Sequence, residues 1–153
     1  MQRKSSDIKT VVRKGSKLRI GIILSDYYKE VADGLLAGVM ETLHEWKVQD
    51  KNISTVRVPG GFEIPLAAQR MIKNKKIDAV ITLGCVMKGE TKHDEFIAMS
   101  VANALQALMM KYEKPIAFGV LTPHSMSQAL ARSSGPGNRG REAATAALEM
   151  VFN

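Results

Sequence analysis

Short apolar runs alternate along the chain with longer stretches in which apolar residues recur at helical spacing, and this alternation restricts the fold more than any other feature. Residues 19–24 form an apolar run rich in β-branched side chains, which is typical of a buried strand. In residues 29–46 the apolar positions lie three and four residues apart, as on one face of a helix. We expect strands at 19–24, 53–58, 77–86 and 115–121, and helices at 29–46, 65–72, 94–112, 125–132 and 138–150.

Strands that are apolar on both faces have to be covered by helices on both sides. The sequence therefore predicts an α/β fold: a three-layer α/β/α sandwich built on a four-stranded parallel sheet. Ligands of such sheets bind beyond the carboxyl ends of the strands. The segments in which functional residues should lie are 25–28, 59–63, 84–93 and the residues from 122 onward.

Local signals mark the starts of two helices. Pro65 suits the first turn of a helix, where a missing backbone N–H is no loss. Ser125 and Gln128 have the spacing of a capping box. Residues 133–137 are rich in Ser, Gly and Pro and are expected to form a turn.

Basic residues are concentrated at the start of the chain. Residues 1–19 hold seven Lys and Arg against Asp7 alone, a net +6 of the chain's +7, so the remainder is nearly neutral. We therefore divide the 153 residues into a basic N-terminal arm, 1–17, and a single domain, 18–153. The arm is interpreted as a solvated or assembly-related tail, with contact to RNA as the alternative, and no specific nucleic-acid partner is expected.

The composition argues against several protein classes. No apolar run approaches the roughly 20 residues that span a bilayer, and the charged start lacks the apolar core of a secretory signal, so we expect no membrane partner. Cys85 is the only cysteine, which excludes an intrachain disulfide and suits a reducing cytoplasm. The three histidines are scattered without metal-ligand spacing, so no metal site is expected.

The segment 84–93, Gly-Cys-Val-Met-Lys-Gly-Glu-Thr-Lys-His, is the richest in chemistry. It follows an expected strand and precedes an expected helix, whose free N–H groups favour an anion such as phosphate. Gly89 permits close approach of the backbone, Thr91 adds a hydroxyl, and His93 can accept and return a proton near neutral pH. The alternative is an ordinary loop with a solvent-exposed histidine. Neither common glycine-rich nucleotide motif is present.

The segment 58–65, Val-Pro-Gly-Gly-Phe-Glu-Ile-Pro, is the second candidate. Its glycines leave backbone groups free to face a ligand, and Glu63 could accept hydrogen bonds from ligand hydroxyls. Alternatively it is a structural turn in which Phe62 plugs the core. Taken alone, this segment favours the structural turn.

Isolated aromatic and basic residues give weaker signals. Tyr27 follows the first expected strand and could stack on a planar heterocycle, although tyrosines there are often packing residues. Phe118 lies within a strand and is more often a core residue. Arg132 and Arg139 flank a glycine-bearing turn, where each could bind a phosphate or simply complement a helix dipole. Cys85, at an apolar strand end, is a poor candidate nucleophile.

Together these segments resemble the 6,7-dimethyl-8-ribityllumazine synthases, which make the direct precursor of riboflavin. The resemblance runs from about Arg19 to the C-terminus, and the order and spacing of the motifs agree. It is carried by residues 58–65, 83–93, 118–122 and 137–140, followed by the Ala-rich segment 142–150.

The resemblance implies a flavodoxin-like domain that assembles into homopentamers with active sites between neighbouring subunits. In some members of the family, twelve pentamers form a hollow shell. The implied reaction joins 5-amino-6-(D-ribitylamino)uracil to 3,4-dihydroxy-2-butanone 4-phosphate and releases phosphate and water. No metal or organic cofactor is implied, and riboflavin synthase is the protein partner that the family suggests.

The resemblance also implies a role for each matching residue. His93 would be the proton-transfer residue. The ribitylaminouracil would be bound by Tyr27, Gly61, Phe62, Glu63, Cys85, Val86, Met87 and Phe118. The butanone phosphate would be bound by Glu90, Thr91, Arg132 and Arg139. Tyr27 would stack on the pyrimidine, and Phe118 and Arg132 would come from the neighbouring subunit.

The chain departs from the family pattern at three places. Asp26-Tyr27-Tyr28 stands where Arg-aromatic-Asn is common, Asp94 follows His93 in place of an aromatic residue, and the turn 133–137 is one residue short. Three other hypotheses stay open. They are a module that binds a lumazine or flavin without turnover, a structural shell protein whose arm packs cargo or RNA, and an unrelated monomeric flavodoxin-like domain.

Overall fold

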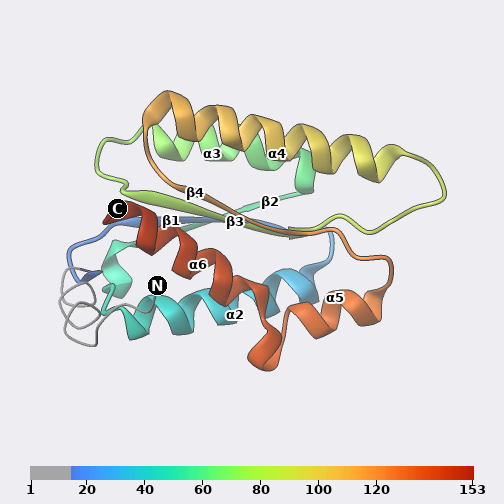
Figure 1. Cartoon of the computed structure of the whole chain (residues 1–153), viewed down its shortest axis with the longest axis horizontal. Helices are drawn as coiled ribbons and strands as arrows, with labels where there is room; N and C mark the ends of the chain where they lie inside the picture. Colours follow the sequence, from blue (N-terminus) through green and yellow to red (C-terminus); the bar gives the residue numbers. More distant parts are fainter. Residues whose placement is uncertain (1–14) are drawn as a thin grey trace.

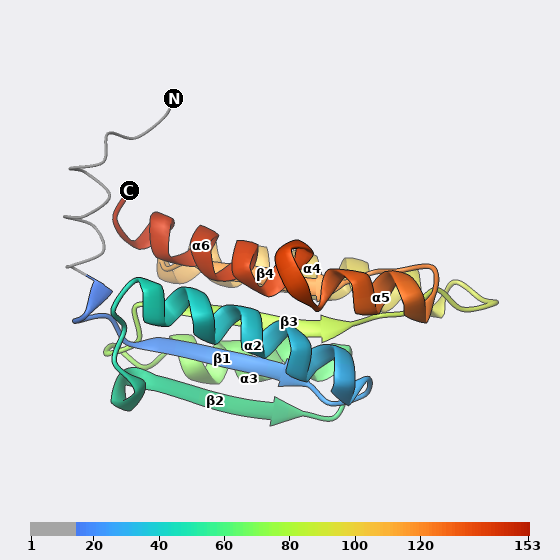
Figure 2. The same ribbon diagram turned by 90° about the horizontal axis from the view of Figure 1, so that it is seen from below.

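The computed structural model describes residues 15–153, so residues 1–14 of the predicted arm lie outside the described residues. Four strands form one parallel sheet in the order β2-β1-β3-β4 (Figure 2). They are β1 (Ile20–Ser25), β2 (Ile53–Val58), β3 (Ala79–Cys85) and β4 (Ile116–Leu121). The predicted parallel sheet is confirmed, and its strand order is that of flavodoxin-like folds.

Helices cover both faces of the sheet, as Figure 1 shows. One layer holds α2 (Lys29–Glu45), α5 (Met126–Arg132) and α6 (Arg139–Val151). The other holds α3 (Ile64–Ile72) and α4 (His93–Tyr112). Short 3-10 turns complete the described elements: η1 (Asp50–Asn52), η2 (Gly61–Glu63) and η3 (Gly135–Gly137). The expected three-layer α/β/α sandwich is confirmed. Within residues 15–153, no helix is long and apolar enough to cross a membrane.

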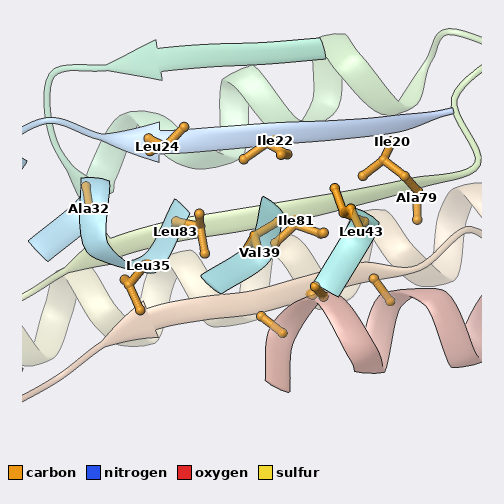
Figure 3. Packing of buried hydrophobic residues seen from close by; sticks show 14 of the residues in the cluster. Ile20, Ile22, Leu24, Ala32, Leu35, Val39, Leu43, Ala79, Ile81 and Leu83 are labelled. Atoms are coloured by element: carbon orange, nitrogen blue, oxygen red, sulfur yellow. The ribbon is translucent and has the colours of Figure 1, made fainter. Parts of the chain in front are cut away.

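The core is divided by the sheet into two clusters because successive strand residues face opposite layers. Ile20, Ile22 and Leu24 of β1 pack toward α2 and α6 together with alternate residues of β3 (Figure 3), whereas Ile23 packs toward α3 and α4. Every residue of β1 and β3 is buried. Each fully buried Ile or Leu side chain contributes about 1.5–3 kcal/mol relative to leaving it exposed, so these two central strands anchor the domain.

The edge strand β2 differs from the central strands. It is a strand as predicted, but four of its six residues are exposed. Its alternating sequence pattern fits this position, since within residues 15–153 only β1 pairs with it.

The predicted helix starts are confirmed, one of them only in part. Pro65 lies in the first turn of α3. The Ser125 hydroxyl accepts the N–H of Gln128 at 3.3 Å, which is one half of the capping box. The Gln128 side chain accepts instead from the N–H of His124, at 2.9 Å, one residue before the expected donor.

A close crossing of α2 and α6 fixes the turn between α5 and α6. A Cβ on Gly140 would lie 2.1 Å from the Leu35 carbonyl oxygen, so only glycine permits this approach. The buried Asn138 accepts the Gly140 N–H at 2.8 Å and donates to the carbonyls of Gly34 and Ser133 at 2.8 and 3.2 Å. The turn is thereby tied to α2, which places the ends of α5 and α6 beside it.

Candidate active site

A cavity of about 950 Å³ opens where β1, β2 and β3 end and α4 begins. The connections after the strands all lie at this end of the sheet (Figure 2). The predicted site residues that line the cavity are Tyr27, Gly61, Phe62, Glu63, Cys85, Val86, Met87, Thr91 and His93. The structure therefore brings together residues from three separate sequence segments, and the volume suits small organic ligands.

Two aromatic side chains line this cavity while remaining exposed. Tyr27 is 73% exposed and Phe62 is 65% exposed. The Tyr27 ring meets Tyr28 edge-on, with the ring centroids 5.0 Å apart and an interplanar angle of 70°. The alternative in which Phe62 plugs the core is wrong. Exposed rings on a cavity wall are suited to stacking on a planar heterocycle.

The backbone after β3 presents polar groups to the same cavity. The N–H groups of Val86 and Lys88 donate to the carbonyls of Leu121 and Pro123, at 2.8 and 3.0 Å, so pairing with the β4 side continues past the strand ends. Because backbone groups alternate in direction along an extended chain, those of Cys85 and Met87 point to the β1 side. The paired part of β1 ends at Ser25, which leaves room there for the edge of a ligand.

His93 is the first residue of α4 and is exposed. Its backbone N–H donates to the Thr91 hydroxyl at 3.3 Å, and the N–H of Gly89 donates to an Asp94 carboxylate oxygen at the same distance. Within residues 15–153 the His93 imidazole has no hydrogen-bond partner, so it is free to meet a ligand. Glu90 is exposed in the same loop but lies outside the cavity lining.

Cys85, the last residue of β3, is only 5% exposed, and burial raises the pKa of its thiol to about 11. A thiol in this state is a poor nucleophile. Cys85 therefore lines the cavity without an activated thiol, as expected from its place at an apolar strand end.

The remaining predicted residues lie in a second cavity, of about 750 Å³, beside β4 and α6. Phe118 is 45% exposed there because β4 is an edge strand, so its interpretation as a core residue is wrong. Arg132 donates to the Gln128 carbonyl at 3.2 Å. Arg139 forms an ion pair with Glu142 at 2.5 Å, which raises the pKa of Arg139. The charge of Arg132 is therefore more available to an anion than that of Arg139.

The two cavities are distinct in a single chain and differ in charge. Among the described residues, those lining the first cavity include Glu63, His93 and Asp94 but neither Lys nor Arg. The second cavity holds Arg132 and Arg139. A cavity lined by acidic and aromatic side chains and a cavity that contains two arginines thus lie at different places on this chain.

Sequence reasoning missed part of the first cavity. The lining residues that it did not single out are all on α4: Phe96, Ile97, Met99, Ser100 and Asn103. A signal was available in α4, whose apolar residues are not confined to one face: Phe96 is 69% and Met99 is 64% exposed. A helix that is apolar all round is normally buried, so this face of α4 is suited to being covered by another chain.

No group of three or more His, Cys, Asp or Glu residues in the described range, 15–153, could hold a metal ion.

Comparison with known proteins gives a consistent result. The family model for 6,7-dimethyl-8-ribityllumazine synthase matches residues 17–153. A 6,7-dimethyl-8-ribityllumazine synthase of Parabacteroides distasonis is 39% identical over 141 residues, which cover 92% of this chain and 88% of the relative. One from Coxiella burnetii is 42% identical over 137 residues, covering 89% and 91%. One from Flavobacterium psychrophilum is 39% identical over 145 residues, covering 94% and 77%.

Proposed function

The chain belongs to the 6,7-dimethyl-8-ribityllumazine synthase family, enzymes of riboflavin biosynthesis, and we propose that it condenses 5-amino-6-(D-ribitylamino)uracil with 3,4-dihydroxy-2-butanone 4-phosphate. The products are the lumazine, phosphate and water. The observation that carries this proposal is the cavity at the carboxyl ends of the strands, in which exposed rings, Glu63 and His93 line one space.

The chemistry requires proton transfer and proximity. An amine of the pyrimidine attacks the ketone, and water leaves as an imine forms. Removal of a proton from the carbon chain then expels phosphate, and the second amine closes the ring onto the carbonyl with loss of a second water. Holding two substrates together supplies up to roughly 7–11 kcal/mol of the barrier reduction in well-oriented cases. His93 is the proposed proton-transfer residue, because it is exposed and its imidazole has no hydrogen-bond partner among the described residues.

The first cavity suits the ribitylaminouracil. Tyr27 would stack on the pyrimidine, and the backbone groups of Cys85 and Met87 would bind its polar edge. The N–H of Val86 is already donated to Leu121, so Val86 would contribute its side chain. Glu63 would accept a ribityl hydroxyl beside Gly61 and Phe62, whose backbone and ring complete this wall.

The phosphate side of the site is proposed to be shared between subunits. A phosphate group needs a cation, which the lining of the first cavity lacks among the described residues. Arg132 of a second copy would supply it, with Phe118 of that copy covering the pyrimidine, and Arg139 would play a smaller part because Glu142 neutralises it. The loop N–H groups of Glu90 and Thr91 would bind the same phosphate.

Such sharing requires an oligomer, which the family implies. We propose a homopentamer, the assembly that the family resemblance implies, in which head-to-tail contacts between unlike surfaces close into a ring. The exposed apolar face of α4 gives such a contact area next to the site. We place the reaction in the cytoplasm, and riboflavin synthase, which would use the product, is the proposed protein partner.

The test is to mix the purified protein with both substrates and follow lumazine fluorescence and phosphate release together, after subtracting the uncatalysed reaction. We expect both products to appear in equal amounts above that background. If the protein binds the ribityl compound tightly but does not accelerate the reaction, it is a binding module and not an enzyme. If the protein neither binds the ribityl compound nor turns over the two substrates, the proposed activity is wrong.

A further inference from the structure

The loop that carries Tyr27 is held by an ion-pair cluster outside the cavity. Arg57, near the end of β2, donates through Nη1 to Asp26 Oδ1 at 2.6 Å and through Nη2 to Asp33 Oδ1 at 2.7 Å. The other oxygen of Asp33 accepts from Lys29 Nζ at 2.5 Å. One guanidinium thus joins β2, the loop after β1 and the first turns of α2.

Apart from this cluster, the loop is held by Tyr28, which packs partly buried against the core on the α2 side of the sheet. Tyr28 is the N-cap residue of α2, and its side chain makes no capping hydrogen bond. Tyr27 is largely exposed, and its ring contact is the edge-on meeting with Tyr28. The backbone N–H of Asp26 donates to the Val58 carbonyl at 2.9 Å. The position of the Tyr27 ring is therefore set by where the backbone of 26–28 is tied, rather than by packing around the ring.

The charges of the cluster are matched. Hydrogen bonds from Lys29 and Arg57 lower the pKa of Asp33, and those to Asp33 and Asp26 raise the pKa of Arg57. The side chains of Arg57, Asp26 and Asp33 are roughly two-fifths exposed and that of Lys29 more so, so each pair alone adds little to stability. The planar fork of arginine nevertheless fixes direction as well as distance, which a single lysine ammonium does not.

Arg57 also lies close in sequence to another segment that lines the cavity. Arg57 is followed by Val58, the end of β2, and then by the segment that carries Gly61, Phe62 and Glu63. A displacement of the Tyr27 loop from β2 would therefore change the gap between the ring that stacks on the pyrimidine and the wall that binds the ribityl chain.

We infer that Arg57 is a positioning residue for ribitylaminouracil binding: by pairing with Asp26 and Asp33 it holds the Tyr27 loop at a fixed distance from the Gly61–Glu63 wall. This inference rests on the proposed function. It predicts that loss of the fork weakens binding of the pyrimidine substrate selectively and leaves the phosphorylated substrate unaffected.

The experiment compares Arg57→Met, Arg57→Lys, Asp26→Asn and the double variant Asp26→Asn/Arg57→Met with the wild-type enzyme. Turnover of the wild type is measured first, since its absence would refute the proposed function and not this inference. Arg141→Met is the matched control, because Arg141 pairs with Glu41 between α6 and α2 at similar exposure.

We expect Arg57→Met and Asp26→Asn each to raise the KM for the ribitylaminouracil about 3- to 10-fold. The KM of the double variant should be no higher than that of Arg57→Met, because the two residues act through one interaction. Arg57→Lys should lie in between, and kcat and the KM for the ketose phosphate should stay near wild type. An unchanged KM in Arg57→Met would overturn the inference. An equal rise in the KM for both substrates, together with a lowered melting temperature of Arg57→Met, would also overturn it. Additive effects on KM in the double variant would do the same.

Discussion

The buried Cys85 thiol gives a prediction whose size follows from the structure. Cys85 ends β3, and burial raises the pKa of its thiol from an ordinary 9.0 to about 11. Thiol reagents attack through the thiolate, so labelling follows the deprotonated fraction. At pH 8 that fraction is about 1 in 10 for an ordinary thiol and about 1 in 1000 for Cys85, since each pKa unit changes it tenfold.

The assay is labelling with a chromogenic disulfide reagent in excess. Cys85 is the only cysteine, so the whole signal reports on this residue. We expect labelling of the folded protein at pH 8 to be at least about 100-fold slower than labelling of the same protein unfolded in guanidinium chloride. The folded-state rate should continue to rise as the pH approaches about 11. Fast labelling at pH 8, or a plateau near pH 9, would refute the account of this burial.

Two consequences connect the thiol to stability and function. Because the folded-state pKa is raised, the contribution of the neutral thiol to stability is fully present below about pH 9 and is lost as the pH rises through about 11. Because the proposed contact is made by the backbone, Cys85→Ala should retain most of its turnover. Loss of turnover in a folded Cys85→Ala assembly would show that the thiol itself takes part.

Three further predictions concern the site and the crossing of α2 and α6. His93→Ala should slow turnover by about 10²–10⁴-fold and not abolish it, because proximity of the substrates remains; steady-state rates check this, and total loss in an intact assembly would contradict it. Arg132→Ala should raise the KM for the ketose phosphate more than Arg139→Ala does, since Glu142 neutralises Arg139; equal effects in substrate titrations would count against the assignment. Gly140→Ala should destabilise the fold by about 1–3 kcal/mol, the usual cost of overpacking. Thermal unfolding checks it against Gly137→Ala, whose added Cβ would make only an ordinary contact at 3.4 Å.

The strands could be predicted from the sequence because each central one is a short run that is buried on both faces. The predicted bounds of β1 and β3 lie within two residues of the observed ones. The exposure of β2 and of Phe118 could not be predicted in this way. Both depend on strand order, which is set by how the crossovers pass over the sheet; the alternating pattern of β2 fits an edge position but does not fix it.

The candidate site could likewise be predicted only in part. Tyr27, Glu63 and His93 could be placed near one another because parallel strands end at the same edge of a sheet. The split into two cavities, with Arg132 in the second, depends on the shape of the whole subunit and has no local sequence signal. The ion-pair partners of Arg57 are likewise far apart in sequence, so only the fold shows that they meet.

The central claim, turnover at a site shared between subunits, is tested most directly by complementation. His93→Ala and Arg132→Ala subunits are expressed together, and turnover is measured at low ketose phosphate, where each variant alone is weak. If His93 and Arg132 of one site come from neighbouring subunits, random mixing in a ring leaves about a quarter of the sites with both wild-type residues, and turnover should recover to that fraction. Activity no higher than the average of the two separate variants would contradict the shared site.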